Sequence, residues 1–194
     1  LLIMHSGGGV MSVEAAREIP ARICQSGPAA GVMAGANLGQ ITGRPNVINL
    51  DVGGTSADVS LARGGRPLIR AEWNVDFNIV INFPSVDVAT IGAGGGSIAR
   101  VDAGGVLKVG PESAGARPGP ACYGHGGEAP TVTDANLVLG RINPENFLGG
   151  QMALDVTAAE SAIAAVAAEI DQSPAKTALG IVQIANNNMI GALR

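Results

Sequence analysis

Residues 47–61 read VINLDVGGTSADVSL, and the interpretation of the whole chain starts from this stretch. An apolar strand over 47–50 ends at Asp51, a Gly-Gly-Thr-Ser turn follows, and a second strand over 58–62 begins at Asp58. Glycines let a backbone turn tightly and approach an anion, and successive amide N–H groups form a concave cradle for phosphate. The stretch therefore predicts a phosphate-binding hairpin. The alternative is an ordinary hairpin in which Asp51 bonds to turn amides.

The phosphate hypothesis gives the turn and the preceding carboxylate different ligands. Because Mg²⁺ prefers few carboxylates together with phosphate oxygens, Asp51 is predicted to hold a magnesium ion through water. The predicted phosphate contacts are the backbone amides of Gly53, Gly54, Thr55 and Ser56, together with the side-chain hydroxyls of Thr55 and Ser56. The sequence contains no Gly-x-Ser-x-Gly, His-Glu-x-x-His or Walker-type Gly-Lys-[Ser/Thr] motif. Phosphate binding is thus the one chemistry that the sequence displays clearly.

The composition is that of a glycine-rich globular chain. Its 194 residues suffice for one large domain with or without an appendage, and 46% apolar against 14% charged residues excludes a disordered chain. No apolar run is long enough to span a bilayer. A net charge of −4 without a basic stripe argues against nucleic acid as a partner. Cys24 and Cys122 have no metal or redox spacing, which suits a reducing cytoplasm.

Strands and helices alternate loosely along the chain, which indicates an α/β fold. Strands are expected at 1–4, 21–24, 47–50, 58–62, 68–73 and 77–83, with a hairpin of 98–101 and 106–109. Helices are expected at 13–17, 28–40, 135–139, 158–170 and from 174 onward. The chain opens without a charged or signal-like region, so we expect that it starts part-way through a strand, as a fragment would.

Several expected helices carry a capping residue at their start. Ser12 is the expected cap of the first short helix, and Pro20 ends it. Thr133 or Asp134 is expected to cap the helix that runs through Leu139. The run Thr157-Ala-Ala-Glu160 fits a capping box.

The hairpin motif also carries a resemblance. Residues 51–60 resemble the second phosphate loop of the actin, sugar-kinase and heat-shock-chaperone ATPase superfamily, although Thr55 stands where the chaperones have a third glycine. The helix that starts at Ser26-Gly-Pro-Ala-Ala-Gly-Val32 looks like the one that precedes this loop in the chaperones.

Over nearly its whole length the chain is similar to the hydantoinase A / 5-oxoprolinase family, which includes N-methylhydantoinase A and the ATPase-subunit relatives of acetone and acetophenone carboxylases. The matching motifs lie at residues 8–12, 26–32, 51–60, 90–97, 109–115, 118–124 and 130–136. Members of the family are several times longer than this chain. The resemblance therefore implies an internal fragment that contains the second of two phosphate loops.

The resemblance implies an actin-like (ribonuclease H-like) ATPase lobe over 1–75 and 131–194, with a β-rich, glycine-rich extension over 76–130. It implies ATP and magnesium as cofactors, with Asp51 positioning the metal and Asp58 orienting the loop or the attacking group. The parent enzyme would use ATP to activate the carbonyl oxygen of a cyclic amide such as 5-oxoproline or a hydantoin. A hydantoinase B-type subunit or domain is the implied partner, and an oligomer is compatible with it.

Three alternatives stay open at this point. The parent enzyme would be the ATPase part of a ketone carboxylase, or a sugar or acetate kinase of the same superfamily. The isolated chain would be an inactive scaffold lobe, because the resemblance places only one phosphate loop inside it.

The glycine-rich stretch 92–99 admits two interpretations. A dinucleotide fingerprint requires a helix after the glycines, but the residues that follow look like a hairpin. The glycines then serve either tight backbone packing or the wall of a nucleotide or substrate cleft formed by Gly94, Gly95, Gly96 and Ser97.

The remaining metal-ligand candidates are Asp87, Cys122, His125 and Asp134. Their spacing matches no zinc signature. Members of the resembled family often have a histidine where Ala89 stands, which weakens a metal site taken from relatives. A buried structural Cys122 and a helix-capping Asp134 are the favoured interpretations.

Overall fold

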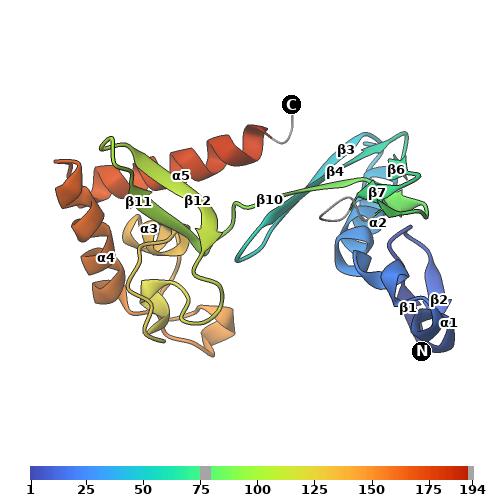
Figure 1. The fold of residues 1–194 in the computed structure, drawn as a ribbon, viewed down its shortest axis with the longest axis horizontal. Coiled ribbons are helices and arrows are strands. Elements are labelled where there is room, and N and C mark those ends of the chain that lie inside the picture. Colours follow the sequence, from blue (N-terminus) through green and yellow to red (C-terminus); the bar gives the residue numbers. More distant parts are fainter. Residues whose placement is uncertain (75–79, 192–194) are drawn as a thin grey trace. The chain divides into compact units, whose positions relative to one another are not determined.

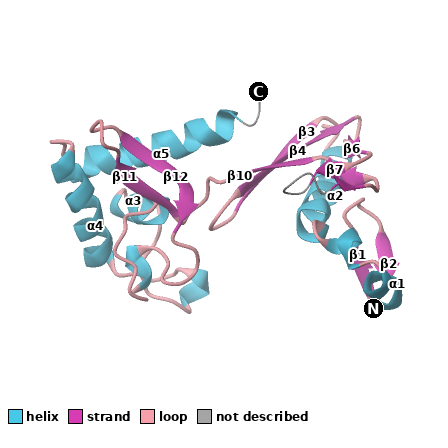
Figure 2. Ribbon diagram, viewed as in Figure 1, coloured by secondary structure: helices cyan, strands magenta, loops and turns pink. Residues whose placement is uncertain are grey.

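The computed structural model describes residues 1–74 and 80–191. They form two compact units (Figures 1 and 2), which we treat separately. The first unit comprises residues 1–51 and 58–90, and the second comprises 52–57 and 91–194. Part of the strand expected over 77–83 lies outside the described residues, as do residues 192–194, for which the sequence predicted a continuation of the last helix.

The first unit begins with a small hairpin and a capped helix. Strand β1 (Leu2–Met4) pairs antiparallel with β2 (Val10–Ser12). The side chain of Ser12 accepts a hydrogen bond from the Ala15 amide and caps α1 (Val13–Glu18), as the sequence predicted. The strand expected at 21–24 is wrong. A 3₁₀ helix (Pro20–Ile23) stands there, because Pro20 presets the helical φ angle at its start.

Helix α2 (Ser26–Ile41) packs against a sheet in the order β10-β4-β3, formed by β3 (Val47–Val52), β4 (Ala57–Arg63) and β10 (Val88–Ile91). Small residues make close packing possible: a Cβ on Gly35 would lie 1.7 Å from Oδ1 of Asn49. The buried apolar contacts between helix and strands are Ala29, Val32, Val86 and Val88.

The remaining strands of the first unit are short. Strand β5 (Arg66–Pro67) pairs antiparallel with β4 after a turn at Gly64 and Gly65, both of which have positive φ angles. Instead of one strand over 68–73, the chain forms β6 (Ile69–Arg70), paired with β9 (Ser85–Val86), and β7 (Trp73–Asn74), paired with β8 (Val80–Ile81). The backbone changes partner after two residues, which hydropathy does not reveal.

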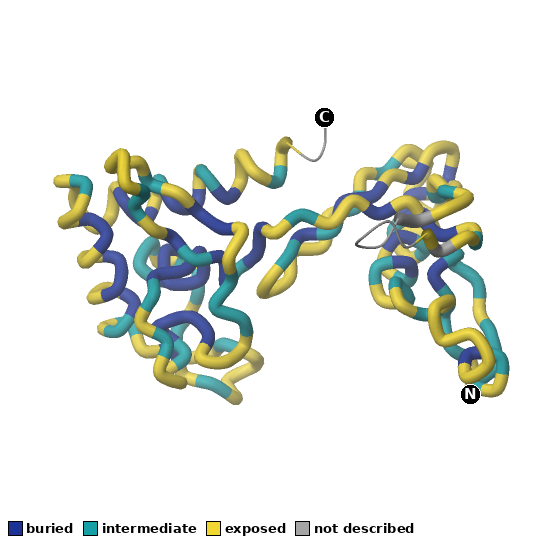
Figure 3. The backbone as a smooth tube through the Cα atoms, in the orientation of Figure 1, coloured by how far each residue is buried: buried dark blue, intermediate teal, exposed yellow. Residues whose placement is uncertain are grey.

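The second unit is built on an antiparallel hairpin of β11 (Ser97–Val101) and β12 (Leu107–Ser113), with Val101 opposite Leu107, as expected. Helices α3 (Val132–Val138), α4 (Val156–Glu169) and α5 (Pro174–Gly191) pack on it. Figure 3 shows the buried residues on the inner sides of these elements. The core is made of Ala99, Val109, Val132, Ala135, Ile163, Ala178, Ile181, Val182 and Ala185.

Two helix caps differ from the predicted ones. The N-cap of α3 is Thr131, and Asp134 closes a capping box with it from the third helical position. The N-cap of α4 is Asp155, whose carboxylate accepts a hydrogen bond from the Ala158 amide at 2.9 Å. In both cases a polar residue a few positions earlier reaches the free amides first, so the predicted cap lies inside the helix.

The second compact unit joins the glycine-rich segment to the C-terminal helices. Residues 131–194 lie in one unit with residues 91–130, whereas nearly all of residues 1–75 lie in the other. The reason is packing: Ala99 and Val109 of the glycine-rich segment share a core with α3, α4 and α5. Among the described residues, no helix is long and apolar enough to cross a membrane.

Candidate functional site

The tip of the β3–β4 hairpin belongs to the second unit and comprises Gly53 to Ser56. The Gly53 amide donates to the Ser56 carbonyl at 2.8 Å and closes the tight turn that the sequence predicted. This amide is therefore not free for the phosphate contact that the sequence also predicted for Gly53. A second segment holds the tip from behind. The amide of Gly95 donates to the Gly53 carbonyl at 3.0 Å, and the amide of Gly96 donates to the Gly54 carbonyl at 2.6 Å.

These two hydrogen bonds fix the direction of the tip amides. In a planar trans peptide the C=O and the following N–H point in opposite directions. Because the carbonyls of Gly53 and Gly54 face the 94–96 loop, the N–H groups of Gly54 and Thr55 face away from it. Both residues are exposed. The tip therefore presents adjacent amide donors outward, the arrangement that binds an anion.

The residues of the tip fit a phosphate group. Within the described residues, the amides of Gly54, Thr55 and Ser56 donate to no protein acceptor. A Cβ on Gly54 would meet no protein atom within 4 Å, so packing does not require glycine there. The space beside Gly54 is open to a ligand, and the hydroxyls of Thr55 and Ser56 stand next to it along the chain.

The 94–96 loop owes its glycines to close backbone packing. A Cβ on Gly94 would lie 2.7 Å from the carbonyl oxygens of both Gly53 and Gly54. Ser97 is fully buried, and its hydroxyl accepts a hydrogen bond from the Gly94 amide at 2.9 Å. The geometry thus supports the packing interpretation of this stretch. Strand β11 follows the glycines, so the dinucleotide fingerprint is absent, as expected.

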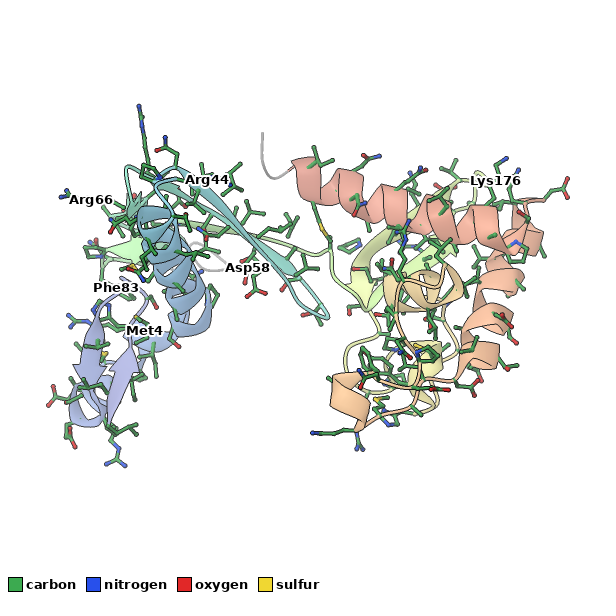
Figure 4. All side chains as sticks on the ribbon, turned by 180° about the vertical axis from the view of Figure 1, so that it is seen from behind. Met4, Arg44, Asp58, Arg66, Phe83 and Lys176 are labelled. Atoms are coloured by element: carbon green, nitrogen blue, oxygen red, sulfur yellow. The ribbon has the colours of Figure 1, made fainter. Side chains whose placement is uncertain are left out.

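Asp51 and Asp58 lie in the first unit and line one cleft of about 350 Å³. One wall is the N-terminal half of α2, with Pro28, Gly31 and Val32, and the other is formed by β3, β4 and Val88. Asp51 is exposed at the end of β3, whereas Asp58 is half-buried on β4. Figure 4 shows the position of Asp58 on the hairpin. The structure therefore brings together the carboxylates that the sequence selected.

Thr90 on β10 is a site residue that the sequence interpretation missed. Its hydroxyl donates to Oδ1 of Asp58 at 2.6 Å and restrains the carboxylate. Thr90 opens the 90–97 motif of the chain. The sequence of that motif indicates a role for its glycines but none for Thr90. Thr90 reaches Asp58 because β10 pairs with β4.

The remaining metal candidates have structural roles. Oδ2 of Asp134 accepts hydrogen bonds from the Thr131 amide and hydroxyl at 2.8 Å each, and Oδ1 accepts one from the Cys122 amide at 2.8 Å. Burial, with a contribution from Asp134, raises the pKa of the Cys122 thiol well above its usual range. Asp87 pairs with Arg70, and no group of at least three possible ligands gathers among the residues described. This arrangement does not fit a metal ion.

The model of the family described as hydantoinase/oxoprolinase matches residues 1–194. The chain belongs to the hydantoinase/oxoprolinase family. Caprolactamase subunit alpha of Pseudomonas jessenii is 44% identical to it over 98% of this chain and 27% of that subunit. The solved ATP-dependent caprolactamase from that organism is 42% identical, with a TM-score of 0.82 over 98% of this chain and 28% of its own.

A second solved structure is also similar to this chain. The nucleotide-free structure of acetone carboxylase, from work on ATP-dependent acetone carboxylation, is 35% identical. Its TM-score is 0.86, and the match covers 97% of this chain and 26% of that one. The mixed α/β fold is therefore shared with both solved relatives. The chain spans between a quarter and a third of the length of these relatives.

Proposed function

We propose that this chain supplies the phosphate-binding hairpin of an ATP-dependent enzyme that opens a cyclic amide. The observation that carries the proposal is the pair of outward-facing amides at Gly54 and Thr55, fixed by the hydrogen bonds behind them. The cyclic-amide substrate is supported by the similarity to caprolactamase subunit alpha, since a lactam is a cyclic amide. In this proposal the hairpin belongs to an actin-like ATPase lobe, as residues 51–60 resemble that superfamily.

Each part of the hairpin has one task in the proposed reaction. The amides of Gly54 and Thr55 and the hydroxyls of Thr55 and Ser56 bind phosphate oxygens and orient the transferring group. Fixed donors of this kind need no reorganisation as negative charge shifts during phosphoryl transfer. Asp58, restrained by Thr90, orients the loop or the attacking group.

Asp51 is the residue proposed to hold magnesium through water. Its carboxylate is exposed in the cleft at the end of β3, and hard oxygen ligands of this type suit Mg²⁺. Bound magnesium neutralises charge on the phosphates when ATP is present. Phosphorylation of the amide oxygen would make the carbonyl carbon electrophilic. Water would then add to that carbon, the ring carbon–nitrogen bond would break with a proton passing to the nitrogen, and the phosphoryl group would leave as inorganic phosphate.

The second candidate function is the ATPase part of a ketone carboxylase. It is favoured by the similarity to acetone carboxylase, whose TM-score of 0.86 is as high as that of the caprolactamase. In this proposal both functions begin with transfer of a phosphoryl group from ATP to a carbonyl oxygen. In either case we propose that a B-type subunit is the partner, since the similar caprolactamase chain is itself a subunit.

The decisive experiment measures substrate-dependent phosphate release. The complete polypeptide that carries these residues is produced with its partner subunit and given magnesium-ATP with 5-oxoproline, caprolactam, a hydantoin, or acetone with bicarbonate. Phosphate release that depends on a cyclic amide and matches ring opening mole for mole is the expected result. Phosphate release only with acetone and bicarbonate selects the second candidate. If ATP is not turned over with any of these substrates, both candidate functions are wrong.

A further inference from the structure

We propose that Thr133 is a positioning residue for the phosphate-binding tip, although it lies a layer behind the residues that would touch the nucleotide. The proposal rests on the function proposed above and adds a residue to it. Thr133 lies at the second position of α3 and is 8% exposed, so it has no access to a ligand. Its role would be exerted entirely through the 94–96 loop.

Thr133 makes two hydrogen bonds to one acceptor. Its amide and its Oγ1 hydroxyl both donate to the Gly95 carbonyl, each at 2.8 Å. The amide is one of the free donors that every helix N-terminus leaves, and the Gly95 carbonyl satisfies it. The hydroxyl adds a second donor that fixes the direction of the same carbonyl. No substitution at Thr133 other than serine keeps this geometry with a side chain of similar size.

Gly95 passes the restraint on to the tip. Its carbonyl is held by Thr133 while its amide donates to the Gly53 carbonyl at 3.0 Å. Gly95 cannot carry a side chain without a clash, because a Cβ would lie 2.8 Å from Oγ1 of Thr133. A rotation of Gly95 would therefore break either the contact with Thr133 or the contact with Gly53. Thr133 thereby limits rotation of the peptide that presents the Gly54 amide outward.

The start of α3 is itself rigidly held. Thr131 and Asp134 form a capping box, and the Asp134 carboxylate also accepts the amide of Cys122. The amide of Ala99 on β11 donates to the Pro130 carbonyl at 2.8 Å, directly before the helix. Thr133 is thus anchored to a buried hydrogen-bond network, which a positioning residue requires.

The first test measures, without any nucleotide, how strongly the amides behind the tip are protected from hydrogen exchange. Amide hydrogen exchange is followed at Gly95 and Gly96 in the complete polypeptide that carries these residues, for the wild type, Thr133→Val and Thr133→Ser. Valine keeps the shape but removes the hydroxyl donor, and serine keeps the donor. Thr177→Val is the matched control, because Thr177 is also buried in a helix and its Oγ1 has no partner among the described residues.

We expect exchange at Gly95 and Gly96 to rise about tenfold in Thr133→Val, as loss of one buried hydrogen bond predicts, and to stay near wild type in Thr133→Ser and Thr177→Val. A rise shared equally by β12 and α5 would reflect a general loss of stability and would overturn the proposal. Unchanged exchange at Gly95 and Gly96 would overturn it as well.

The second test measures turnover in the complete polypeptide with its partner subunit. Thr133→Val should lower kcat about tenfold while KM for ATP changes less than twofold, because oriented donors act most strongly on the charge that develops during transfer. Thr133→Ser should restore kcat. Equal kcat in Thr133→Val and the wild type would refute the positioning role. A wild type without ATP turnover would instead refute the proposed function, while the exchange result still decides whether Thr133 holds the tip.

Discussion

Thr90 donates a hydrogen bond of 2.6 Å from its hydroxyl to the Asp58 carboxylate. The two residues are far apart in the sequence and meet because β10 pairs with β4. Because this bond holds Oδ1 of Asp58 in place, the carboxylate has a preferred orientation in the cleft that it shares with Asp51.

Removal of this bond should slow catalysis and leave the fold intact. Because Thr90 is exposed, Thr90→Val should change the free energy of unfolding by less than about 1 kcal/mol. It should lower kcat about five- to tenfold by freeing Asp58, and Thr90→Ser should restore it. Steady-state kinetics of the complete enzyme checks this. A serine variant as slow as the valine variant would show that the methyl group, not the hydroxyl, matters.

Asp51→Asn should reduce ATP-dependent turnover by at least about 100-fold, because the amide keeps the shape but loses the negative charge that we propose positions magnesium. The melting temperature should stay within about 2 °C, since Asp51 is exposed and no described residue bonds to its side chain. Turnover and melting curves are measured on the same preparation. Wild-type turnover in a folded Asp51→Asn enzyme would remove this residue from the mechanism.

Two glycine substitutions distinguish a glycine that leaves room for a ligand from a glycine that is needed for backbone packing. Gly54→Ala adds a methyl group that touches no protein atom, so stability should change by less than about 0.5 kcal/mol while the affinity for ATP falls. Gly94→Ala places a methyl group 2.7 Å from the tip carbonyls and should destabilise the chain by about 1–3 kcal/mol. Chemical denaturation and nucleotide titration provide the readouts. Equal nucleotide affinity in Gly54→Ala and the wild type would argue against a phosphate beside that residue.

The two cysteines should differ sharply in reactivity. Cys24 is exposed, whereas Cys122 is 1% exposed and burial raises its pKa, so its thiol stays protonated as the pH rises through 9. A thiol reagent at pH 8 should modify Cys24 in the folded chain and both cysteines after denaturation. Mass spectrometry of the labelled peptides identifies the sites. Rapid labelling of Cys122 without denaturant would contradict its burial.

Ionisation of Cys122 should also make stability depend on pH. In the unfolded chain a cysteine has a pKa of about 8.5, whereas in the folded chain burial raises the pKa of Cys122 and its thiol stays protonated. The unfolded state therefore binds fewer protons above this pH, and the free energy of unfolding falls as the pH rises from 8 to 10. Denaturation curves of the wild type and Cys122→Ala should show a smaller fall in the variant.

The sequence predicted the elements whose signals are local. Asp51, the glycines of the turn and Asp58 form a hairpin because an apolar strand meets a turn that only glycine-rich sequences adopt easily. Pro174 begins α5, where the sequence predicted a helix, and Ala178, Val182 and Ala185 form part of its buried side. Periodicity over many residues makes such predictions reliable.

The sequence could not predict what depends on long-range contacts. The packing of Gly94 against Gly53 and Gly54 joins segments about 40 residues apart, and nothing in either segment names its neighbour. The cap of α3 was assigned to Thr133 or Asp134 because both are capping residues, whereas Thr131 is the cap. Because Thr133 is not the cap, its hydroxyl donates to the Gly95 carbonyl instead, a long-range contact that the sequence does not indicate.

The tip amides are oriented from behind, by main-chain hydrogen bonds from Gly95 and Gly96. This separates two kinds of substitution. A change at the exposed side of the tip leaves the hydrogen bonds that orient the amides in place, whereas a change at 94–96 or at Thr133 alters those bonds. Engineering of a new specificity on this chain should therefore begin in the cleft walls and leave the rear layer unchanged.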